Sequence, residues 1–167
     1  MKEEKIVHPI PPLYRPDSEM LILGSFPSVK SRESAFFYGH PQNRFWKVMA
    51  AVFEDEVPED VPQRREFLIR NRIAAWDVIH SCSIRGSSDA SIKDVIANDL
   101  TVILDNAPIR RIYVNGKTAE KMYKKYIQPV IGRKAVCLPS TSPANAAWSL
   151  ERLIEAWSAV REQEEAH

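Results

Sequence analysis

The chain has 167 residues, of which 44% are hydrophobic and 27% are charged, and its formal net charge is +1. This size and balance are typical of one globular domain, expected here over residues 1–167, and no apolar stretch is long enough to span a membrane. Cys82 and Cys137 are too few for a disulfide framework or a cysteine-bound metal cluster, and the N-terminus lacks the apolar run of a secretory signal, so a cytoplasmic location is expected.

The N-terminal part of the chain predicts an extended segment and then a buried strand. Four prolines within residues 1–19 predict an extended arm on the surface, namely Pro9, Pro11, Pro12 and Pro16. Residues 20–23 form a short apolar run that ends at Gly24, which predicts a buried strand that breaks into a loop.

Helices and strands are expected to alternate along the rest of the chain. Apolar residues recur at helical spacing from Phe45, which predicts a helix over about 43–53, and Pro62 opens a second helix that runs to Arg70. The other expected elements are a strand at 73–79, a polar loop at 81–91, a helix through 92–106, a strand at 109–114, a helix at 117–126, a strand at 134–138 and a last helix from Ser149 to about Glu164.

This alternation places the chemistry at one edge of a sheet. Strands separated by helices predict a parallel sheet covered on both faces. The loops after Leu23, Ile79 and Leu138 leave the carboxyl ends of their strands, which is where ligands bind in open α/β sheets.

Three segments carry the functional signal, GSFPS at 24–28, FYGHPQNRFW at 37–46 and LPSTSPAN at 138–145. They resemble the uracil-DNA glycosylase superfamily. FYGHPQNRFWKVM is similar to the segment after the first active-site loop of mismatch-specific uracil/thymine-DNA glycosylases, and STSPANAAWSLERLIEAW to their second active-site loop and the helix after it. A GSFPS loop without an acidic or amide residue, followed by a tyrosine-bearing segment, most resembles the hypoxanthine-DNA glycosylase branch.

The resemblance implies a fold, a reaction and a partner. The fold is expected to be an α/β three-layer sandwich with a central, mainly parallel four-stranded sheet flanked by helices. The expected reaction is hydrolysis of the N-glycosidic bond of a deaminated base flipped out of DNA, above all hypoxanthine, by a monofunctional glycosylase in base excision repair. The expected partner is double-stranded or single-stranded DNA, bound by a monomer that needs no cofactor.

The first loop, formed by Gly24, Ser25, Phe26, Pro27 and Ser28, is the expected binding site for the base. Gly24 permits close approach of the backbone to a ligand, and Ser25, Phe26 and the loop backbone are candidates for contacts to O6 and N1 of hypoxanthine. Phe26 stands where the mismatch-specific enzymes have an asparagine that holds the attacking water, so no general base is expected in this loop. A simple turn at the end of a strand is the alternative interpretation.

Asn43 and Tyr38 are the candidates in the second segment. Asn43 stands at the start of a predicted helix, where its side chain would cap a free backbone amide. The resemblance instead implies a catalytic role, because the hypoxanthine branch has an asparagine in this segment that replaces the missing loop residue. An amide cannot take a proton at neutral pH, so the reaction would be largely dissociative. Tyr38 stands where an aromatic ring stacks on the flipped base, the alternative being an ordinary core aromatic.

The second loop is expected to supply a hydroxyl, backbone amides and a wedge for the minor groove. Ser140 falls where other branches have histidine or asparagine and is a candidate catalytic residue, although a shifted alignment puts Leu138 there. The residues of this loop expected to contact DNA are Ser142, Pro143, Ala144 and Asn145. Without the resemblance, the segment is a serine-rich turn before the last helix.

Further DNA contacts are expected near Gly116 and Lys117, because VNGKTAEK is similar to a segment of thymine-DNA glycosylases that holds a phosphate at a helix start. The stretch 110–134 carries basic residues against a single acid, Glu120, which suits either a phosphate-facing side or a solvated helix. Asp77 is expected to be a buried structural hydrogen-bonder. His40 and His80 are isolated, so no metal site is expected.

Three functions are therefore compared: a hypoxanthine-DNA glycosylase, a mismatch-specific uracil/thymine-DNA glycosylase, and a non-catalytic α/β module that binds DNA or a nucleotide. Phe26 in place of asparagine favours the first over the second. Both loops together with Tyr38 argue against the third.

Overall fold

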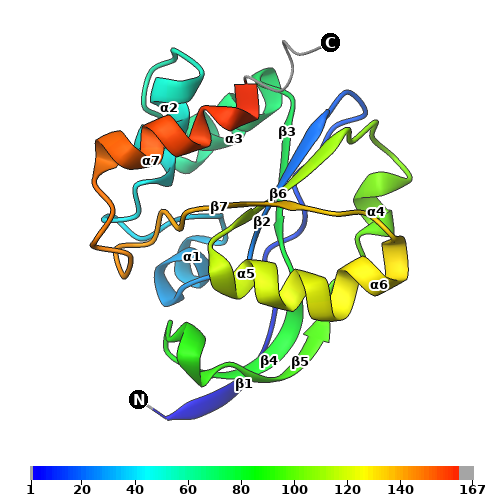
Figure 1. Ribbon diagram of the computed structural model, residues 1–167. Coiled ribbons are helices and arrows are strands. Elements are labelled where there is room, and N and C mark those ends of the chain that lie inside the picture. The colour runs from blue at the N-terminus through cyan, green and yellow to red at the C-terminus, as the bar shows by residue number, and fades with distance from the viewer. Residues whose placement is uncertain (1, 162–167) are drawn as a thin grey trace.

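A computed structural model describes residues 2–161 and contains two β-sheets (Figure 1). The larger sheet has the strand order β3-β2-β6-β7, and each neighbouring pair is parallel. Its strands are β2 (Met20–Gly24), β3 (Ile73–Asp77), β6 (Arg111–Asn115) and β7 (Val136–Leu138). The parallel four-stranded sheet predicted from the sequence is therefore confirmed.

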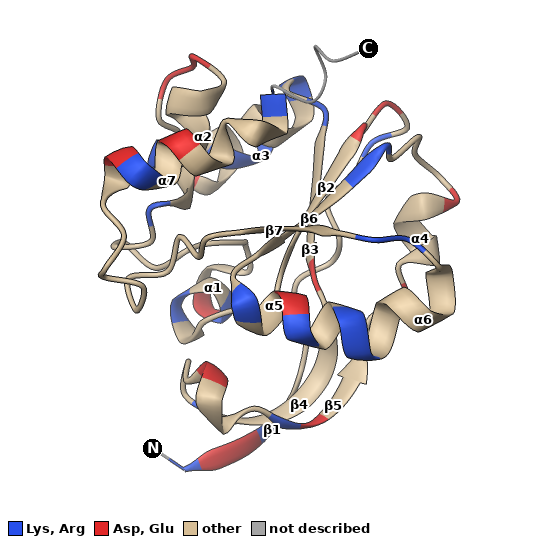
Figure 2. Ribbon diagram, viewed as in Figure 1, with Lys and Arg blue, Asp and Glu red and all other residues tan. Residues whose placement is uncertain are grey.

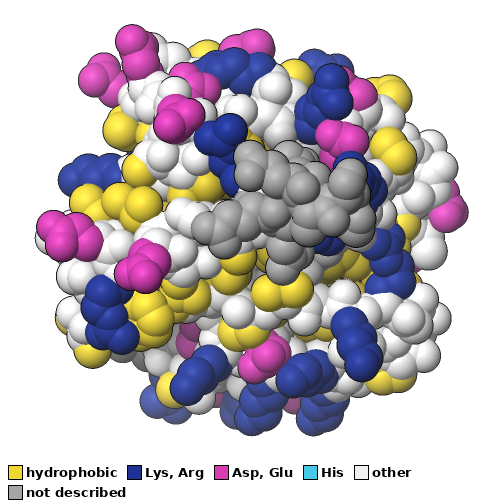
Figure 3. Space-filling view, turned by 45° about the horizontal axis from the view of Figure 1, so that its top comes forward, with side chains coloured by type: hydrophobic (Ala, Val, Ile, Leu, Met, Phe, Trp, Pro, Cys, Tyr) yellow, Lys and Arg dark blue, Asp and Glu magenta, His cyan; other side chains and the backbone are white. Residues whose placement is uncertain are grey.

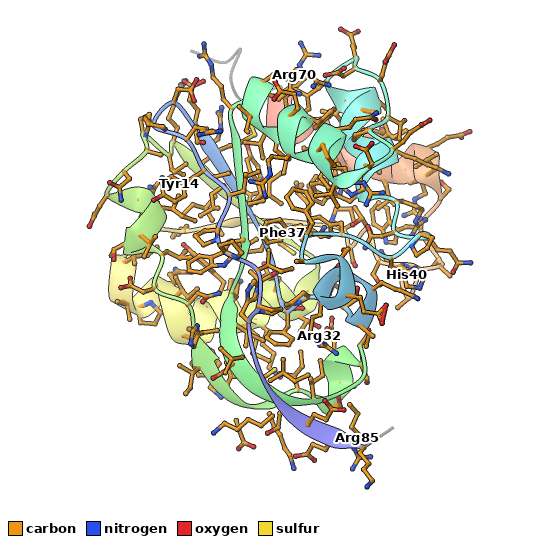
Figure 4. All side chains as sticks on the ribbon, turned by 180° about the vertical axis from the view of Figure 1, so that it is seen from behind. Tyr14, Arg32, Phe37, His40, Arg70 and Arg85 are labelled. Carbon is orange, nitrogen blue, oxygen red and sulfur yellow. The ribbon has the colours of Figure 1, made fainter. Side chains whose placement is uncertain are left out.

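Helices flank this sheet, as expected for an α/β fold. They are α1 (Val29–Ser34), α2 (Phe45–Val52), α3 (Val61–Arg70), α4 (Thr101–Leu104), α5 (Lys117–Met122), α6 (Gln128–Ile131) and α7 (Leu150–Trp157). α5 lies in front of the sheet in Figure 1, whereas α3 is the nearer helix in the reverse view of Figure 4, so the two cover opposite faces. Within residues 2–161, no helix is long and apolar enough to cross a membrane.

Two of the predicted helices differ from those observed. The helix expected over 117–126 is α5 followed by a π-helical turn, η2 (Tyr123–Ile127), and then by α6. The last helix begins where Ser149 caps it, since the Ser149 hydroxyl accepts a hydrogen bond from Arg152 N at 3.2 Å. Its expected end at Glu164 lies outside the described residues.

A second, antiparallel sheet corrects the prediction for residues 79–106. It has the order β1-β4-β5, formed by β1 (Glu3–Val7), β4 (Ile79–Arg85) and β5 (Lys93–Ala97). The polar loop expected at 81–91 is therefore strand as far as Arg85, and its last three residues form a short 3₁₀ turn, η1 (Asp89–Ser91). The helix expected through 92–106 is wrong, because β5 pairs with β4 and only α4 is helical. Short apolar runs fit either structure, and tertiary strand pairing decided between them.

The strand expected over 73–79 is in fact divided between the two sheets. β3 ends at Asp77, and the chain then turns into β4 at Ile79. The Asn98 side chain bridges this turn, because its Nδ2 donates to the carbonyl oxygens of Asp77 at 2.9 Å and Ile79 at 3.2 Å. The turn therefore keeps the end of β3 fixed although the strand stops there.

The N-terminal segment contributes more than a surface arm. Residues Glu3–Val7 form β1, which pairs with β4 in a register that places Glu3 opposite Arg85. Ile10 and Leu13 are buried, and Leu13 forms an isolated bridge with Ala75 of β3. The segment expected to lie on the surface therefore adds apolar side chains to the core.

Helix α7 ties the core to the second loop. The Trp157 side chain is fully buried, its ring meets Phe45 of α2 edge-on at 5.9 Å, and its Nε1 donates to Pro139 O at 2.9 Å. Pro139 follows β7 directly. The packing of α7 therefore positions the segment that leads into the second loop.

The substitution Leu153→Ala in α7 is expected to lower the free energy of unfolding by ~2–5 kcal/mol, because Leu153 is fully buried and its loss leaves a cavity. Leu150→Ala is the matched control, since Leu150 begins the same helix and is 36% exposed, and it should cost less than ~1 kcal/mol. Urea denaturation measures both values. Equal losses would contradict the packing described for α7.

Candidate active site

The carboxyl ends of β2, β3 and β6 border a cavity of about 560 Å³. The first loop, the second loop, the segment with Tyr38 and Asn43, and the turn η1 meet around it. The predicted site residues that line it are Gly24, Ser25, Phe26, Pro27, Ser28, Tyr38, Asn43, Ser140, Ser142, Pro143 and Ala144. Gly116, Lys117 and Asn145, the other predicted site residues, are not among the residues of 2–161 that line this cavity.

In the first loop, the carbonyl groups of Gly24 and Ser25 accept hydrogen bonds within the protein, whereas the Phe26 amide donates none to the residues that the structure describes. Gly24 O accepts a hydrogen bond from Val78 N at 2.8 Å, and Ser25 O accepts one from Ile79 N at 3.1 Å. The Phe26 side chain is buried, with 8% of the residue exposed, and adds no polar group to the cavity. The Phe26 N–H has no acceptor among residues 2–161. The loop therefore offers a ligand a backbone donor and little acceptor capacity.

The first loop is held in shape by the helix that follows it. Ser28 caps α1, since its Oγ accepts a hydrogen bond from Ser31 N at 3.1 Å, so the Ser28 side chain has a structural task. Arg32 of α1 donates to Pro27 O and to Gly86 O, each at 3.1 Å. Figure 4 shows Arg32 between α1 and the turn after β4. This arginine, which joins the first loop to that turn, carries no sequence signal that would have identified it.

Tyr38 lies against Phe45 and presents a buried hydroxyl group. The two rings are stacked with centroids 3.9 Å apart, so only the other face of Tyr38 is open to a ligand. The hydroxyl has no hydrogen-bond partner among residues 2–161. Burial raises the pKa of Tyr38, and the negative charge of Asp77 raises it further. The Asn115 side chain lowers this pKa by a smaller amount. The hydroxyl is therefore neutral and able to donate.

Asn43 combines the two interpretations that the sequence left open. Its Oδ1 accepts a hydrogen bond from Phe45 N at 2.9 Å, so the side chain does satisfy an amide at the start of α2. Its Nδ2 has no acceptor among residues 2–161, and the residue lines the cavity. One end of the amide group supports the helix, and the other is available to a ligand.

Arg44 fastens the second loop to the segment with Asn43. Its guanidinium donates to Trp148 O, to Ser142 O at 3.3 Å and to Asn145 O at 3.0 Å. Its backbone N donates to Thr141 O at 3.1 Å. Arg44 stands in the motif at 37–46, but nothing in the motif indicates which carbonyl groups its side chain reaches. Its role could therefore not be predicted from the sequence.

A pair of reciprocal hydrogen bonds anchors the same loop to the sheet. Asn115, the last residue of β6, donates from Nδ2 to Thr141 Oγ1 at 3.0 Å, and Thr141 N donates to Asn115 Oδ1 at 3.1 Å. Thr141 is completely buried. Its position inside the serine-rich segment gives the only sequence signal for this anchor.

The remaining polar groups of the second loop mostly bind one another. Ser140 Oγ accepts a hydrogen bond from Ser142 N at 3.1 Å, and Asn145 Nδ2 donates to Ser140 O at 3.0 Å. The Asn145 side chain is therefore engaged within the loop, whereas Ala144 is exposed at its tip. Ser140 keeps a hydroxyl hydrogen that a ligand could accept.

Gly116 has a role in packing that the sequence does not indicate. Its N–H, expected to help hold a phosphate, donates to Leu138 O at 2.8 Å and is not free. Its φ of 97° favours glycine, and a Cβ at this position would lie 3.0 Å from Ser140 Cβ. Lys117, the next residue, is exposed at the start of α5. Gly116 therefore permits the second loop to approach β6.

A buried pair of ionisable groups lies at the floor of the cavity. Asp77, expected as a structural hydrogen-bonder, lines the cavity, and its Oδ2 lies 2.7 Å from His8 Nε2. The two side chains are only 7% and 2% exposed, respectively. The His8 ring also packs edge-on against Phe26 at 5.8 Å. His8 is separated from Asp77 by 69 positions, so no local pattern could have identified it.

Asp89 of η1 is a second carboxylate at the edge of the cavity. Its Oδ1 accepts a hydrogen bond from Ser25 Oγ at 3.3 Å, which links η1 to the first loop. Desolvation raises the pKa of Asp89 although the residue as a whole is exposed, and hydrogen bonds from Ser25 and Thr118 oppose the shift.

Charge is unevenly distributed over the surface. Figure 2 shows basic residues along α5 and the helical turns that follow it, and acidic residues around the loop after α2. In Figure 3 basic side chains form a row along the lower edge of the face, while acidic side chains gather at its upper left. Within residues 2–161 no three His, Cys, Asp or Glu side chains are grouped closely enough to hold a metal ion.

Comparisons with known proteins agree on one family. The model of the Uracil DNA glycosylase superfamily matches residues 11–161. A protein of Methanosarcina barkeri named hypoxanthine DNA glycosylase is 32% identical over 150 residues, which is 89% of this chain and 93% of the relative. A protein of Methanosarcina acetivorans with the same name is 34% identical over 146 residues, 86% of this chain and 90% of the relative. The solution NMR structure of a candidate uracil DNA glycosylase from Methanosarcina acetivorans matches with a TM-score of 0.77 at 33% identity, covering 90% of this chain and 93% of that one.

Arg44→Lys is expected to loosen the second loop, because a lysine ammonium cannot reach three carbonyl groups in the fork geometry of arginine. Amide hydrogen exchange over residues 141–148 should become faster, and the free energy of unfolding should fall by roughly 1–3 kcal/mol. Arg72→Lys is the control, since Arg72 is exposed and, among residues 2–161, its side chain pairs with Glu19 alone, across 3.3 Å. Unchanged exchange in the Arg44 variant would show that the loop does not depend on this side chain.

Proposed function

Because the chain belongs to the uracil-DNA glycosylase superfamily, it is a DNA glycosylase that hydrolyses an N-glycosidic bond, and we propose that the base it removes is hypoxanthine. The observation that carries this choice is the chemistry of the first loop. Phe26 stands where the mismatch-specific enzymes hold the attacking water, and its buried side chain offers no polar group. The loop offers the departing base a backbone N–H instead, which suits a reaction that depends on stabilising the leaving group.

The cavity supports the binding of a purine that has been flipped out of the duplex. Its volume of about 560 Å³ lies within the range of ligand pockets. The open face of Tyr38 is available for stacking on the base, which would restore part of the stacking lost on extrusion. The names of the two Methanosarcina relatives support hypoxanthine in particular.

The proposed reaction is dissociative and monofunctional. The bond between N9 and C1′ breaks first, and N9 keeps the electron pair while positive charge develops on the sugar. The Phe26 N–H and the Ser140 hydroxyl would stabilise the departing base, and Asn43 would hold the water that then adds to C1′. The proton that this water gives up is taken up by the departing base, which leaves as neutral hypoxanthine. No lysine lines the cavity formed by residues 2–161, so a covalent amine intermediate is not proposed.

We further propose how DNA approaches the cavity. Lys117 would contact a phosphate, and the second loop would enter the minor groove with the exposed Ala144 at its tip, next to Ser142, Pro143 and Asn145. The enzyme would act as a monomer on double-stranded or single-stranded DNA. It would be cytoplasmic and, in a bacterial or archaeal cell, associated with the nucleoid. A mismatch-specific uracil/thymine glycosylase is the alternative.

A panel of end-labelled duplexes tests the substrate. Inosine opposite thymine should be excised faster than uracil opposite guanine or thymine in a G·T mismatch under single-turnover conditions, because the first loop lacks the pyrimidine enzymes' asparagine. The strands should break only after treatment with alkali, as expected when an intact abasic site is left. Faster release of uracil than of hypoxanthine would replace the proposal by the mismatch-specific alternative.

Two substitutions separate the roles of Asn43. Asn43→Ala should abolish most base release and cost ~1 kcal/mol of stability, because both the ligand contact and the bond to Phe45 N are lost. Asn43→Ser should keep most of that stability, since a hydroxyl can also accept from a nearby amide, but base release should remain impaired. Thermal melting and single-turnover rates measure the two effects. A serine variant with wild-type turnover would leave Asn43 only its structural role.

A further inference from the structure

The peptide group between Tyr38 and Gly39 is held at both ends. Its oxygen accepts a hydrogen bond from Trp46 Nε1 at 3.1 Å, and its N–H donates to Ser31 Oγ at 2.9 Å. The oxygen and the hydrogen of a trans peptide point in opposite directions, so two such bonds fix the orientation of the whole plane. We propose that Ser31 and Trp46 are positioning residues that hold the Tyr38 ring where a flipped base stacks on it. The inference rests on the stacking role that the proposed function gives to Tyr38.

The backbone of Tyr38 has a conformation that requires such support. Its φ is 51°, which lies in the left-handed region that residues with a Cβ rarely adopt. A bulky residue stays in this region only where the surrounding structure determines its conformation, and such residues gather at functional sites. Without the two hydrogen bonds, Tyr38 would relax toward a negative φ. Its ring would then leave its place beside the cavity.

The strained conformation directs the Tyr38 ring to the cavity. One face of the ring stacks on Phe45 with the centroids 3.9 Å apart, and the residue lines the cavity. The hydroxyl reaches the end of β2, since it lies 3.4 Å from the position that a Cβ on Gly24 would occupy. A ring that is fixed at its backbone and at its inner face presents its outer face without further ordering when a base arrives. Preorganisation of this kind lowers the conformational cost of binding.

Trp46 of α2 has a role beyond filling the core. Its residue is only 3% exposed, its ring is stacked with Phe36 at 6.2 Å, and the Arg64 guanidinium lies 5.3 Å from the ring centroid. A phenylalanine could fill most of this space, but only an indole can also donate to Tyr38 O. Trp46 is not among the residues of 2–161 that line the cavity, so it acts on a bound base through its neighbours.

Ser31 of α1 connects the same peptide group to the first loop. The residue is 2% exposed, and its Oγ also accepts a hydrogen bond from Ser28 Oγ at 3.1 Å. Gly39 permits this close approach, because a Cβ there would lie 2.8 Å from Ser34 Oγ and 3.1 Å from Ser31 Cα. One chain of hydrogen bonds therefore sets both the loop that faces the base and the ring that stacks on it.

The affinities of the protein for two duplexes separate stacking from other contacts with DNA. One duplex carries 2′-fluorodeoxyinosine, whose fluorine slows cleavage of the glycosidic bond, and the other carries an abasic site, which has no base to stack. The measured quantity is the affinity for the inosine analogue relative to that for the abasic duplex. Tyr38→Ala should lower this relative affinity by roughly 5- to 100-fold, the range for loss of a base–aromatic contact.

The variants of the two positioning residues are expected to act through Tyr38. Trp46→Phe and Ser31→Ala should each lower the relative affinity by roughly 3- to 10-fold, because each removes one bond to the peptide group. In the Tyr38→Ala background the same substitutions should change it by less than about twofold, since no ring remains to be positioned.

Two matched controls remove similar groups elsewhere. Trp76→Phe removes an indole that donates to Ile10 O at 3.1 Å, and Ser34→Ala removes an exposed hydroxyl from α1. Both should keep the relative affinity within about twofold of wild type. If Trp46→Phe does not fold, Trp46 is replaced by benzothienylalanine, which has sulfur in place of the indole N–H and so keeps the shape while removing the donor.

The outcomes separate this inference from the proposed function. A loss that persists in the Tyr38→Ala background, or equal weakening of both duplexes by every variant, shows that Ser31 and Trp46 only support the fold and overturns the inference. If wild-type protein excises uracil and not hypoxanthine, the proposed substrate fails. The same series is then measured with 2′-fluorodeoxyuridine, because stacking requires a base but no particular base edge. A relative affinity that falls in the same way supports the inference, and an unchanged one overturns it.

Discussion

The shape of the site depends on hydrogen-bond donors that satisfy the carbonyl groups of its two loops. A buried carbonyl group without a partner costs as much as a lost hydrogen bond, and loops cannot supply partners as helices and strands do. Arg44 provides donors to three carbonyl groups of the second loop, and Arg32 provides them to the first loop and the turn beside it. Neither arginine is among the residues of 2–161 that line the cavity. The two side chains therefore hold the loops that frame the cavity from outside it.

The polar groups of the cavity are arranged for recognition more than for proton transfer. Tyr38 stays neutral, Asn43 cannot take a proton, and the carboxylate at the floor is held by a histidine donor. Neither the Tyr38 hydroxyl nor the Asn43 amide can therefore activate water as a general base would. The cavity can, however, bind the leaving group while the glycosidic bond breaks and positive charge develops on the sugar. A positioned water would then add to the sugar.

The sequence was sufficient for the central sheet and for most of the cavity wall, because short apolar runs ending in polar loops identify parallel strands and their carboxyl ends. It failed at β5, where Val95 and Ile96 fit a helix as well as a strand and only pairing with β4 decides. It also missed His8 and Arg44, whose tasks depend on groups distant in the chain. Asp77 was expected to be a buried structural hydrogen-bonder, and nothing local to it indicates that its carboxylate also lines the cavity. The hydrogen bonds that Gly116 and Asn145 make within the protein could not be predicted either, because their partners, Leu138 O and Ser140 O, are set by the packing of the second loop against β6.

Strand β1 makes the floor of the cavity depend on contacts between distant parts of the chain. Its pairing with β4 joins Glu3 to Arg85, and the bond that reaches the cavity spans 69 positions. Contacts between such distant segments form slowly, since a long loop must close before any of them is gained. During synthesis β1 leaves the ribosome before β4, and it stays unpaired until β4 has been made. The charged side chains of Glu3, Glu4 and Lys5 suit this interval, because charge on an edge strand opposes pairing with the wrong chain. The floor of the cavity is then closed by a segment that was made well before β4.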